Sequence, residues 1–286
     1  MTEGGLDAPT RHVLDWRNPD FHDPTAIDAE LRRVFDICHG CRRCFNLCDS
    51  FPRLFDLIDE SKTGELDSVA SADFGPVIDA CTLCDMCFMV SCPYTPPHEF
   101  DLDFPHLVLR ARAARAGKVG LFEREMVKTD RNGRLARLAP GLANWATATD
   151  NGLTRPLMES IAGIHREAHL PAYHKPTFAA RAEAEPLQVN REAPAHGRTA
   201  VLYATCFVNY NNPGVGAAAR RVLAWNGVET VVDYPGCCGM PQLEQGDIAE
   251  VAAKAKAVAA ALGPRIENGA AIVALTPSCA LMLKFE

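Results

Sequence analysis

Eight of the twelve cysteines fall into two runs of regular spacing. The first run consists of Cys38, Cys41, Cys44 and Cys48, and the second consists of Cys81, Cys84, Cys87 and Cys92. Three thiolates spaced by two residues can wrap one iron-sulfur cube, because each turn of the loop brings the next sulfur to a neighbouring iron. The spacing therefore predicts two [4Fe–4S] clusters.

The fourth cysteine of such a run usually reaches across to the other cluster. We therefore expect cluster A to be held by Cys38, Cys41, Cys44 and Cys92, and cluster B by Cys81, Cys84, Cys87 and Cys48. Two features depart from the usual pattern. Asp49 follows Cys48 where a proline is usual, and the last gap of the second run is four residues instead of three. All eight ligand positions are nevertheless filled.

Two other chemistries use closely spaced cysteines. Structural zinc is held by paired cysteines two residues apart, with four ligands per site. A triplet with a following cysteine, present twice, matches zinc poorly and matches cubane clusters well. Disulfides or free thiols are the remaining alternatives, and a chain of 286 residues without a signal peptide is a poor match to a secreted disulfide scaffold.

Composition places limits on location and partners. The chain is long enough for two domains or three small units. Its start, Met1 to Gly5, is polar, and no run approaches the roughly 18–20 apolar residues that span a bilayer. We therefore expect a cytoplasmic protein without a transmembrane segment. The net charge of −7 argues against nucleic acid as a partner.

Residues 110–137 are the basic exception in an otherwise acidic chain. They could dock on an acidic partner subunit or peripherally on the anionic inner face of the membrane. A solvated helix face is the simpler interpretation.

Residues 1–104 are predicted to form a helical ferredoxin-type domain. Asp23 and Pro24 suit a helix start, and Ile27, Leu31 and Phe35 recur at helical spacing toward Cys38. A second helix is expected after the first run, then a polar loop over residues 59–73 and a helical lead-in to Cys81. Strand signals are nearly absent from residues 23–92, so we expect the clusters to lie among helices.

Residues 105–197 are predicted to be a helical connector ending in a linker. A helix should start at Pro105 and stop near Gly117, with more helices to about residue 170. A loose group of histidines follows, His165, His169 and His174, but no further metal ligand is evident and we expect them at the surface. Prolines at 171, 176, 186 and 194 indicate an extended linker.

Residues 198–286 have a different pattern. Short strands are predicted at 200–204, 228–233 and 271–275, with helices at 213–225 and from Asp247 to Gly263 between them. This β-α-β-α-β order implies a small parallel sheet with right-handed crossovers. The fold class expected for the whole chain is thus α plus α/β.

The four remaining cysteines each follow a predicted strand: Cys206 the first, Cys237 and Cys238 the second, and Cys279 the third. Parallel strands place these loops at one edge of the sheet, where such sheets bind ligands. The four thiols should therefore converge and could hold a third iron-sulfur cluster. Buried cysteines that serve only as core residues are the alternative.

Cys206, the Cys237-Cys238-Gly239 triplet and Cys279 resemble the cysteine-rich CCG domain of heterodisulfide reductase subunits. With the two ferredoxin-type runs before it, the chain is similar to the iron-sulfur subunits of anaerobic glycerol-3-phosphate dehydrogenase and of glycolate oxidase. It is also similar to heterodisulfide-reductase-related proteins found with rubrerythrin. The resemblance implies an electron carrier beside a flavoprotein dehydrogenase subunit or a rubrerythrin-like redox partner.

Two departures from that family bear on function. Its motif ends in a further cysteine three residues after Cys279, where this chain has Met282, and a thioether replaces a bridging thiolate poorly. Relatives usually carry two CCG domains, so we expect this chain to be a fragment or a shortened product.

Three functions follow from these observations. The first is an electron-transfer subunit, with no catalytic side chain of its own, between a flavoprotein dehydrogenase and a quinone or soluble acceptor. The alternative is thiol or disulfide reduction at the CCG site, as in heterodisulfide reductase, which would need a substrate pocket. The third is a zinc-stabilised interaction module. The chain lacks a Gly-x-Gly-x-x-Gly motif after a strand, which argues against dinucleotide binding.

Overall fold

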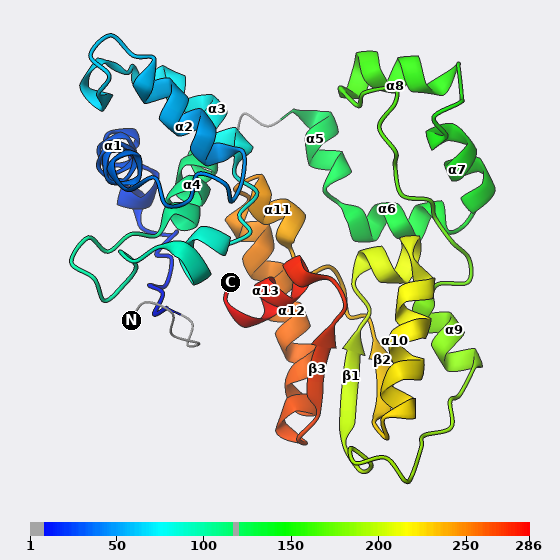
Figure 1. The fold of residues 1–286 in the computed structure, drawn as a ribbon. Helices are drawn as coiled ribbons and strands as arrows, with labels where there is room; N and C mark the ends of the chain where they lie inside the picture. Colours follow the sequence, from blue (N-terminus) through cyan, green and yellow to red (C-terminus); the bar gives the residue numbers. More distant parts are fainter. Residues whose placement is uncertain (1–8, 117–119) are drawn as a thin grey trace. The chain divides into compact units, whose positions relative to one another are not determined.

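The computed structural model describes residues 9–116 and 120–286, and its elements are labelled in Figure 1. The chain divides into two compact units, Met1–Val119 with Leu243–Ile248, and Gly120–Gln242 with Ala249–Glu286. The polar start of the chain and Lys118 of the basic stretch lie outside the described residues. Among the helices that are described, none is both long and apolar enough to cross a membrane.

The first unit is built from short helices. Its elements are η1 (Pro19–His22), α1 (Pro24–Cys41), α2 (Ser50–Asp59), η2 (Leu66–Ser68), η3 (Ser71–Phe74), α3 (Gly75–Ala80), η4 (Cys87–Ser91) and α4 (Phe104–Ala113). No strand occurs among its described residues, as the sequence predicts for residues 23–92. Helix α4 ends at Ala113, and the predicted stop at Gly117 lies outside the described residues.

Aromatic packing holds α1, α2 and α4 together around the cysteine runs. Asp23 caps α1 by accepting hydrogen bonds from the backbone amides of Thr25 and Ala26, as its position before Pro24 predicts. Farther along α1, Phe35 is fully buried. Its ring centroid lies 5.1 Å from that of Phe74 and 5.9 Å from that of Phe104 of α4. Rings at these distances bury large apolar areas in a small unit.

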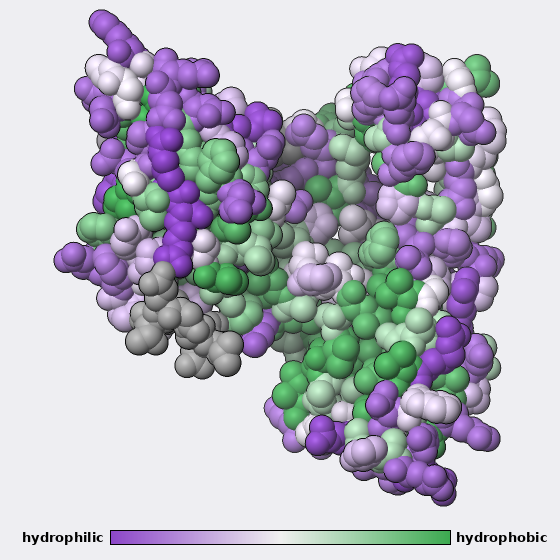
Figure 2. Space-filling view, viewed as in Figure 1, coloured by the Kyte–Doolittle hydropathy of each residue, from purple (hydrophilic) through white to green (hydrophobic). Residues whose placement is uncertain are grey.

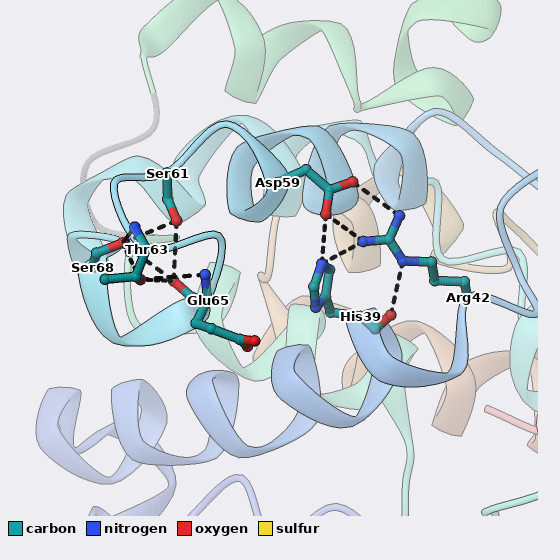
Figure 3. A network of polar contacts seen from close by, with 7 residues as sticks. All are labelled: His39, Arg42, Asp59, Ser61, Thr63, Glu65 and Ser68. Atoms are coloured by element: carbon teal, nitrogen blue, oxygen red, sulfur yellow. Dashed lines mark hydrogen bonds and ion pairs between the residues drawn. The ribbon is translucent and has the colours of Figure 1, made fainter.

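The predicted polar loop after α2 is closed by hydrogen bonds between hydroxyl groups (Figure 3). Thr63 Oγ1 donates to Ser68 Oγ at 2.8 Å, and Ser68 Oγ donates to Ser61 Oγ at 2.9 Å. The Ser68 oxygen also accepts from the Thr63 amide at 3.2 Å. These bonds give the loop a fixed shape although it contributes little apolar surface.

The second unit contains the parallel sheet. Helices and strands from residue 120 onward are α5 (Leu121–Met126), α6 (Thr129–Ala136), α7 (Pro140–Thr147), α8 (Thr154–Ala162), α9 (Phe178–Ala184), β1 (Thr199–Tyr203), η6 (Phe207–Asn211), α10 (Pro213–Trp225), β2 (Glu229–Asp233), α11 (Met240–Glu244), α12 (Ile248–Glu267), β3 (Ala271–Ala274) and α13 (Pro277–Lys284). The strand order is β2-β1-β3 and both pairings are parallel, which confirms the predicted β-α-β-α-β arrangement.

The two faces of this sheet are covered differently. Leu202 pairs with Val232 and Val273, and these side chains pack with Phe178 and Val208 in a buried apolar cluster. Side chains alternate along a strand, so the neighbours of Leu202 point to the opposite face. On that face, residues of β3 and α12 line a shared cavity.

The structure corrects two predictions for this half of the chain. The proline-rich stretch is not an extended linker throughout, because it contains α9, whose Phe178 is 1% exposed in the sheet core. Helix α12 does not end at Gly263 but continues through Pro264 to Glu267. The helix ends only before Gly269, which adopts a φ of 83° and donates its amide to Ile266 O at 2.8 Å.

Close packing of α10 on α9 predicts a sharp effect of one methyl group. A Cβ at Gly216 would lie 2.6 Å from the Phe178 ring, whereas a Cβ at Gly214 would meet only Asn212 Oδ1 at 3.5 Å. We expect Gly216→Ala to lower the free energy of unfolding by about 1–3 kcal/mol, because overpacking displaces the ring. Gly214→Ala, earlier in the same helix, is the control and should be neutral or slightly stabilising. Urea unfolding followed by circular dichroism measures both, and equal effects would contradict the packing argument.

Candidate functional site

Helix α1 positions the first cysteine run. Cys38 and Cys41 lie in its last turn, and Arg42 ends the helix with a left-handed φ of 52°. Figure 3 shows Arg42 and His39 converging on Asp59 at the end of α2. Arg42 Nη1 donates to Asp59 Oδ2 at 2.9 Å, and His39 Nε2 lies 2.9 Å from Asp59 Oδ1. Hydrogen bonds from Arg42 and His39 lower the pKa of Asp59 to about 2, so the carboxylate stays charged and fixes the turn after Cys41.

Helix α3 and the tight loop after it position the second run. Leu83 and Asp85 have positive φ values of 49° and 58°, which turn the chain sharply between Cys81 and Cys87. Arg112 holds the start of this loop, because its Nη2 lies 2.7 Å from Ile78 O and also donates to Cys81 O. Arg112 belongs to the basic stretch, and its guanidinium binds backbone carbonyls within the first unit.

The longer gap of the second run forms a π-turn. Element η4 spans Cys87–Ser91, and the Cys92 amide donates to Cys87 O at 2.8 Å, a bond across five residues. A π-turn accommodates one residue more than an α-turn and is frequent at functional sites. The four-residue gap is thus absorbed as one wide turn that ends at Cys92.

The two runs meet within the first unit. Burial raises the pKa of Cys38, and the nearby sulfurs of Cys92, Cys44 and Cys41 raise it further. Burial also raises the pKa of Cys92 to about 11, with added effects of Cys44 and Cys41. Cys92 therefore lies among the sulfurs of the first run. The Ser91 hydroxyl, next to Cys92, lies 3.6 Å from the Cys44 sulfur of the first run.

The sulfurs around Cys81 include one from the first run. Burial raises the pKa of Cys81 to about 11, and among sulfurs the neighbours that contribute are Cys48 and Cys84. The Cys87 thiol is affected by burial, then by Cys44 and Cys81, so it lies where the two groups adjoin. Cys84 is the exposed member of the eight. Cys48 affects the pKa of Cys81 in the second run and also that of Cys44 in the first, while Cys92 affects that of Cys38.

The donor chemistry is consistent with iron-sulfur clusters. All twelve cysteines, each within the described residues, are free thiols. In residues 9–116 and 120–286, no three histidine, cysteine, aspartate or glutamate side chains surround a point that could hold one metal ion. A zinc site gathers four ligands around one ion, whereas each cysteine of a cube binds a different iron. The assignment of individual ligands stays a prediction.

The CCG cysteines converge at one edge of the sheet. Cys206 precedes η6, a second π-turn in which the Asn212 amide donates to Phe207 O at 2.8 Å. Cys279 lies in the first turn of α13, after β3. Its sulfur is 3.2 Å from that of Cys238, which follows β2.

Cys237 is the thiol of this group that ionises most readily. Hydrogen bonds from the Cys206 and Cys238 thiols lower its pKa, and the Gly239 amide, 3.5 Å from its sulfur, stabilises the thiolate as well. The same bonds raise the pKa of Cys206 and of Cys238, because those two thiols keep their protons when Cys237 loses its own. The group is thus arranged to hold negative charge on sulfur.

Sequence reasoning missed Thr129, which reaches the same group from α6. Its Oγ1 donates to the Cys206 sulfur at 3.3 Å and lies 3.6 Å from the Cys237 sulfur. Thr129 stands in the basic stretch, where the charges dominate the pattern, so no sequence signal distinguishes it. A Cβ at Gly133, one turn later, would overlap the Tyr210 ring, which shows how closely α6 packs on η6.

A cavity of about 620 Å³ adjoins this group of thiols. It is lined by apolar residues of α12, β3 and α13, with Cys238 and Met282 in its wall. Figure 2 shows apolar side chains gathered over the region where β3 and α13 lie. Met282, which stands where the family motif has a cysteine, is 8% exposed.

The loose group of histidines does not form a comparable site. His165 lies 4.0 Å from Glu159, and the His174 backbone amide donates to Tyr210 O.

Nearby, the side chain of Arg155 is 1% exposed and donates to the carbonyls of His165, Arg166 and Ala168, so this turn is held by a buried guanidinium.

Comparison with known proteins bears on the second unit. Residues 200–284 match the family model of the CCG cysteine-rich domain. The match includes all four cysteines of the converging group, and residues 1–199 lie outside it. No solved structure matches the chain. A CCG cysteine-rich domain beside eight further cysteines is consistent with an iron-sulfur redox role.

The acid sensitivity of the first unit should depend on Asp103. This carboxylate caps α4 by accepting from the His106 amide at 3.1 Å. Burial opposes its ionisation, but hydrogen bonds from His106 and Arg11 outweigh burial and lower its pKa to about 2. The folded pKa lies below the unfolded value of about 3.9. The ionised group therefore stabilises the fold above about pH 4, and its contribution is lost as the pH falls through about 2.

We therefore expect Asp103→Asn to lower the free energy of unfolding by about 2 kcal/mol at pH 5. The difference from wild type should shrink as the pH is lowered to 3. Urea unfolding of the metal-free proteins at several pH values measures it, and a difference independent of pH would contradict the role of the charge.

Proposed function

We propose that this chain is an iron-sulfur electron-transfer subunit whose first unit binds two [4Fe–4S] clusters. The observation that supports the proposal is the convergence of the two cysteine runs, in which the Cys44 sulfur lies 3.6 Å from the hydroxyl of Ser91, next to Cys92. When bound, such clusters take up and release one electron at a time. The proposed division is a ferredoxin-type domain over residues 1–104, a connector over 105–197 and a CCG domain over 198–286.

The chain's own residues prepare these sites in three ways. Arg42 and Arg112 fix the backbone at the start of each run, so the sulfurs are ordered before a metal binds. Desolvation of the partly buried Cys38 and the buried Cys81 disfavours isolated thiolates there, so ionisation of these thiols would be coupled to metal binding. The exposed Cys84 would hold cluster B at a position that a partner could approach.

The proposed partner is a flavoprotein dehydrogenase of the glycerol-3-phosphate or glycolate type, or a rubrerythrin-like redox protein, with a quinone or a soluble acceptor. The resemblance to the iron-sulfur subunit of anaerobic glycerol-3-phosphate dehydrogenase supports this choice. Exposed apolar side chains on α7 and α8 support a protein contact, since Leu142 is 65% exposed, Trp145 54% and Leu157 57%. Exposed apolar patches commonly mark interaction sites.

Cluster content and the crossed ligand sets can be tested together. We expect the anaerobically purified, reduced protein to give two interacting cubane signals in low-temperature electron paramagnetic resonance. Cys84→Ser should remove one signal, and Cys48→Ser should affect that same signal, whereas Cys92→Ser and Cys41→Ser should affect the other. Iron and acid-labile sulfide analysis provides the control on loading. A colourless protein containing zinc would end the proposal, and an unaltered spectrum for Cys84→Ser would contradict the crossed assignment.

A second function, thiol or disulfide reduction at the CCG site, is favoured by the apolar cavity beside Cys238. Such chemistry needs a substrate pocket next to the redox-active sulfurs, and this cavity is within the size range of ligand sites. Met282 in place of the motif's last cysteine weakens this function.

We expect the reconstituted protein, supplied with a one-electron donor, to reduce small disulfides no faster than the Cys238→Ser variant. The assay follows loss of disulfide and appearance of free thiol. Turnover that depends on Cys238 would favour the second function over the first.

A further inference from the structure

Arg11 connects the N-terminal segment with the second cysteine run. Its Nη1 donates to Asp85 Oδ2 at 2.5 Å and its Nη2 to Asp85 Oδ1 at 3.1 Å. On its other side, Nε donates to Asp103 Oδ2 at 2.8 Å and Nη2 to Asp103 Oδ1 at 3.1 Å. One guanidinium thus makes a two-bond pair with each of two carboxylates, which its planar fork permits and a lysine ammonium does not.

This ion group is buried beside the loop that carries cluster B ligands. The side chains of Arg11, Asp85 and Asp103 are 10%, 1% and 18% exposed. Asp85 stands between the predicted ligands Cys84 and Cys87, and its φ of 58° is unfavourable for a residue with a side chain. Such a conformation persists only where the surroundings fix it. The contacts from Arg11 supply that fixation.

The guanidinium also covers the far end of the same loop. Its Cζ lies 4.7 Å from the centroid of the Phe88 ring, directly after Cys87. The Met89 amide donates to Asp85 O at 2.8 Å, which closes the backbone around the start of the π-turn. Arg11 therefore contacts side chains on both sides of Cys87.

Charge adds a second effect to the geometric one. Arg11 carries one positive charge into a region where Asp85, Asp103 and the predicted thiolates are all negative. Reduction of an iron-sulfur cluster adds a further negative charge, so a buried cation nearby favours the reduced state. Loss of Arg11 would also take this cation from the buried Asp85 carboxylate, which is unfavourable, while Asp103 would keep its contact with His106.

We propose that Arg11 is a positioning residue for cluster B, which holds the loop from Cys84 to Cys87 in its binding conformation and raises the reduction potential at that site. The proposal rests on the proposed function, because it presumes that this loop binds a cluster.

The test compares Arg11→Gln and Arg11→Lys with wild type after anaerobic reconstitution. Potentiometric titration monitored by electron paramagnetic resonance gives the potential of each cluster, and the signal lost in Cys84→Ser identifies cluster B. In Arg11→Gln we expect the cluster B signal to lose intensity and its potential to shift to more negative values, with cluster A unchanged. In Arg11→Lys the charge is kept but both two-bond pairs are lost, so intensity should fall while the potential stays near that of wild type.

Arg33→Gln is the matched control. Arg33 also pairs with a carboxylate, that of Glu30, and donates to Phe100 O at 2.8 Å, but its side chain is 40% exposed on α1, so its loss should leave cluster B unchanged. Full cluster B intensity in Arg11→Lys would overturn the positioning role, even if Arg11→Gln failed to fold. An equal shift of both potentials in Arg11→Gln would overturn the local effect of charge. Wild-type protein without a second signal would refute the proposed function itself, and the role of Arg11 would fall with it.

Discussion

Desolvation of closely grouped sulfurs is the constraint on which the cysteine sites of both units depend. Cys81 is buried and Cys38 is partly buried next to other cysteines, and both desolvation and neighbouring sulfurs oppose their ionisation. Several thiolates at such a site become stable only when cations compensate them, which is why metal binding and folding of such sites are coupled. The CCG group meets the same constraint through hydrogen bonds that concentrate negative charge on Cys237.

Arginine side chains hold the backbone that presents these sulfurs. Arg112 binds carbonyls before Cys81, Arg42 binds Asp59 beyond Cys41, and Arg11 binds Asp85 between two predicted ligands. Guanidinium groups suit this task because they donate in several directions at once and stay charged when partly buried. Loops that lack regular secondary structure are in this way fixed by side chains from distant parts of the chain.

Much of this arrangement could be predicted from local patterns. Apolar spacing predicted α1, α10 and the three strands, because core-facing residues repeat with the period of the element. Strand order placed Cys206, Cys238 and Cys279 at one edge. The contacts of Arg11 and Thr129 could not be predicted, because each depends on residues more than seventy positions away. Helix α9 was missed because prolines around it suggested an extended chain, while its anchoring residue, Phe178, is a single apolar position.

The two π-turns, η4 and η6, lie next to cysteines and bear on how the cysteines are spaced. The first begins at Cys87 and the second directly after Cys206, and each closes a backbone hydrogen bond across five residues. An inserted residue in the second run is accommodated by a wider turn, and Cys92 still reaches the sulfurs of the first run. The interval from Cys87 to Cys92 is therefore a single wide helical turn, and a motif defined by a fixed three-residue gap would overlook this chain.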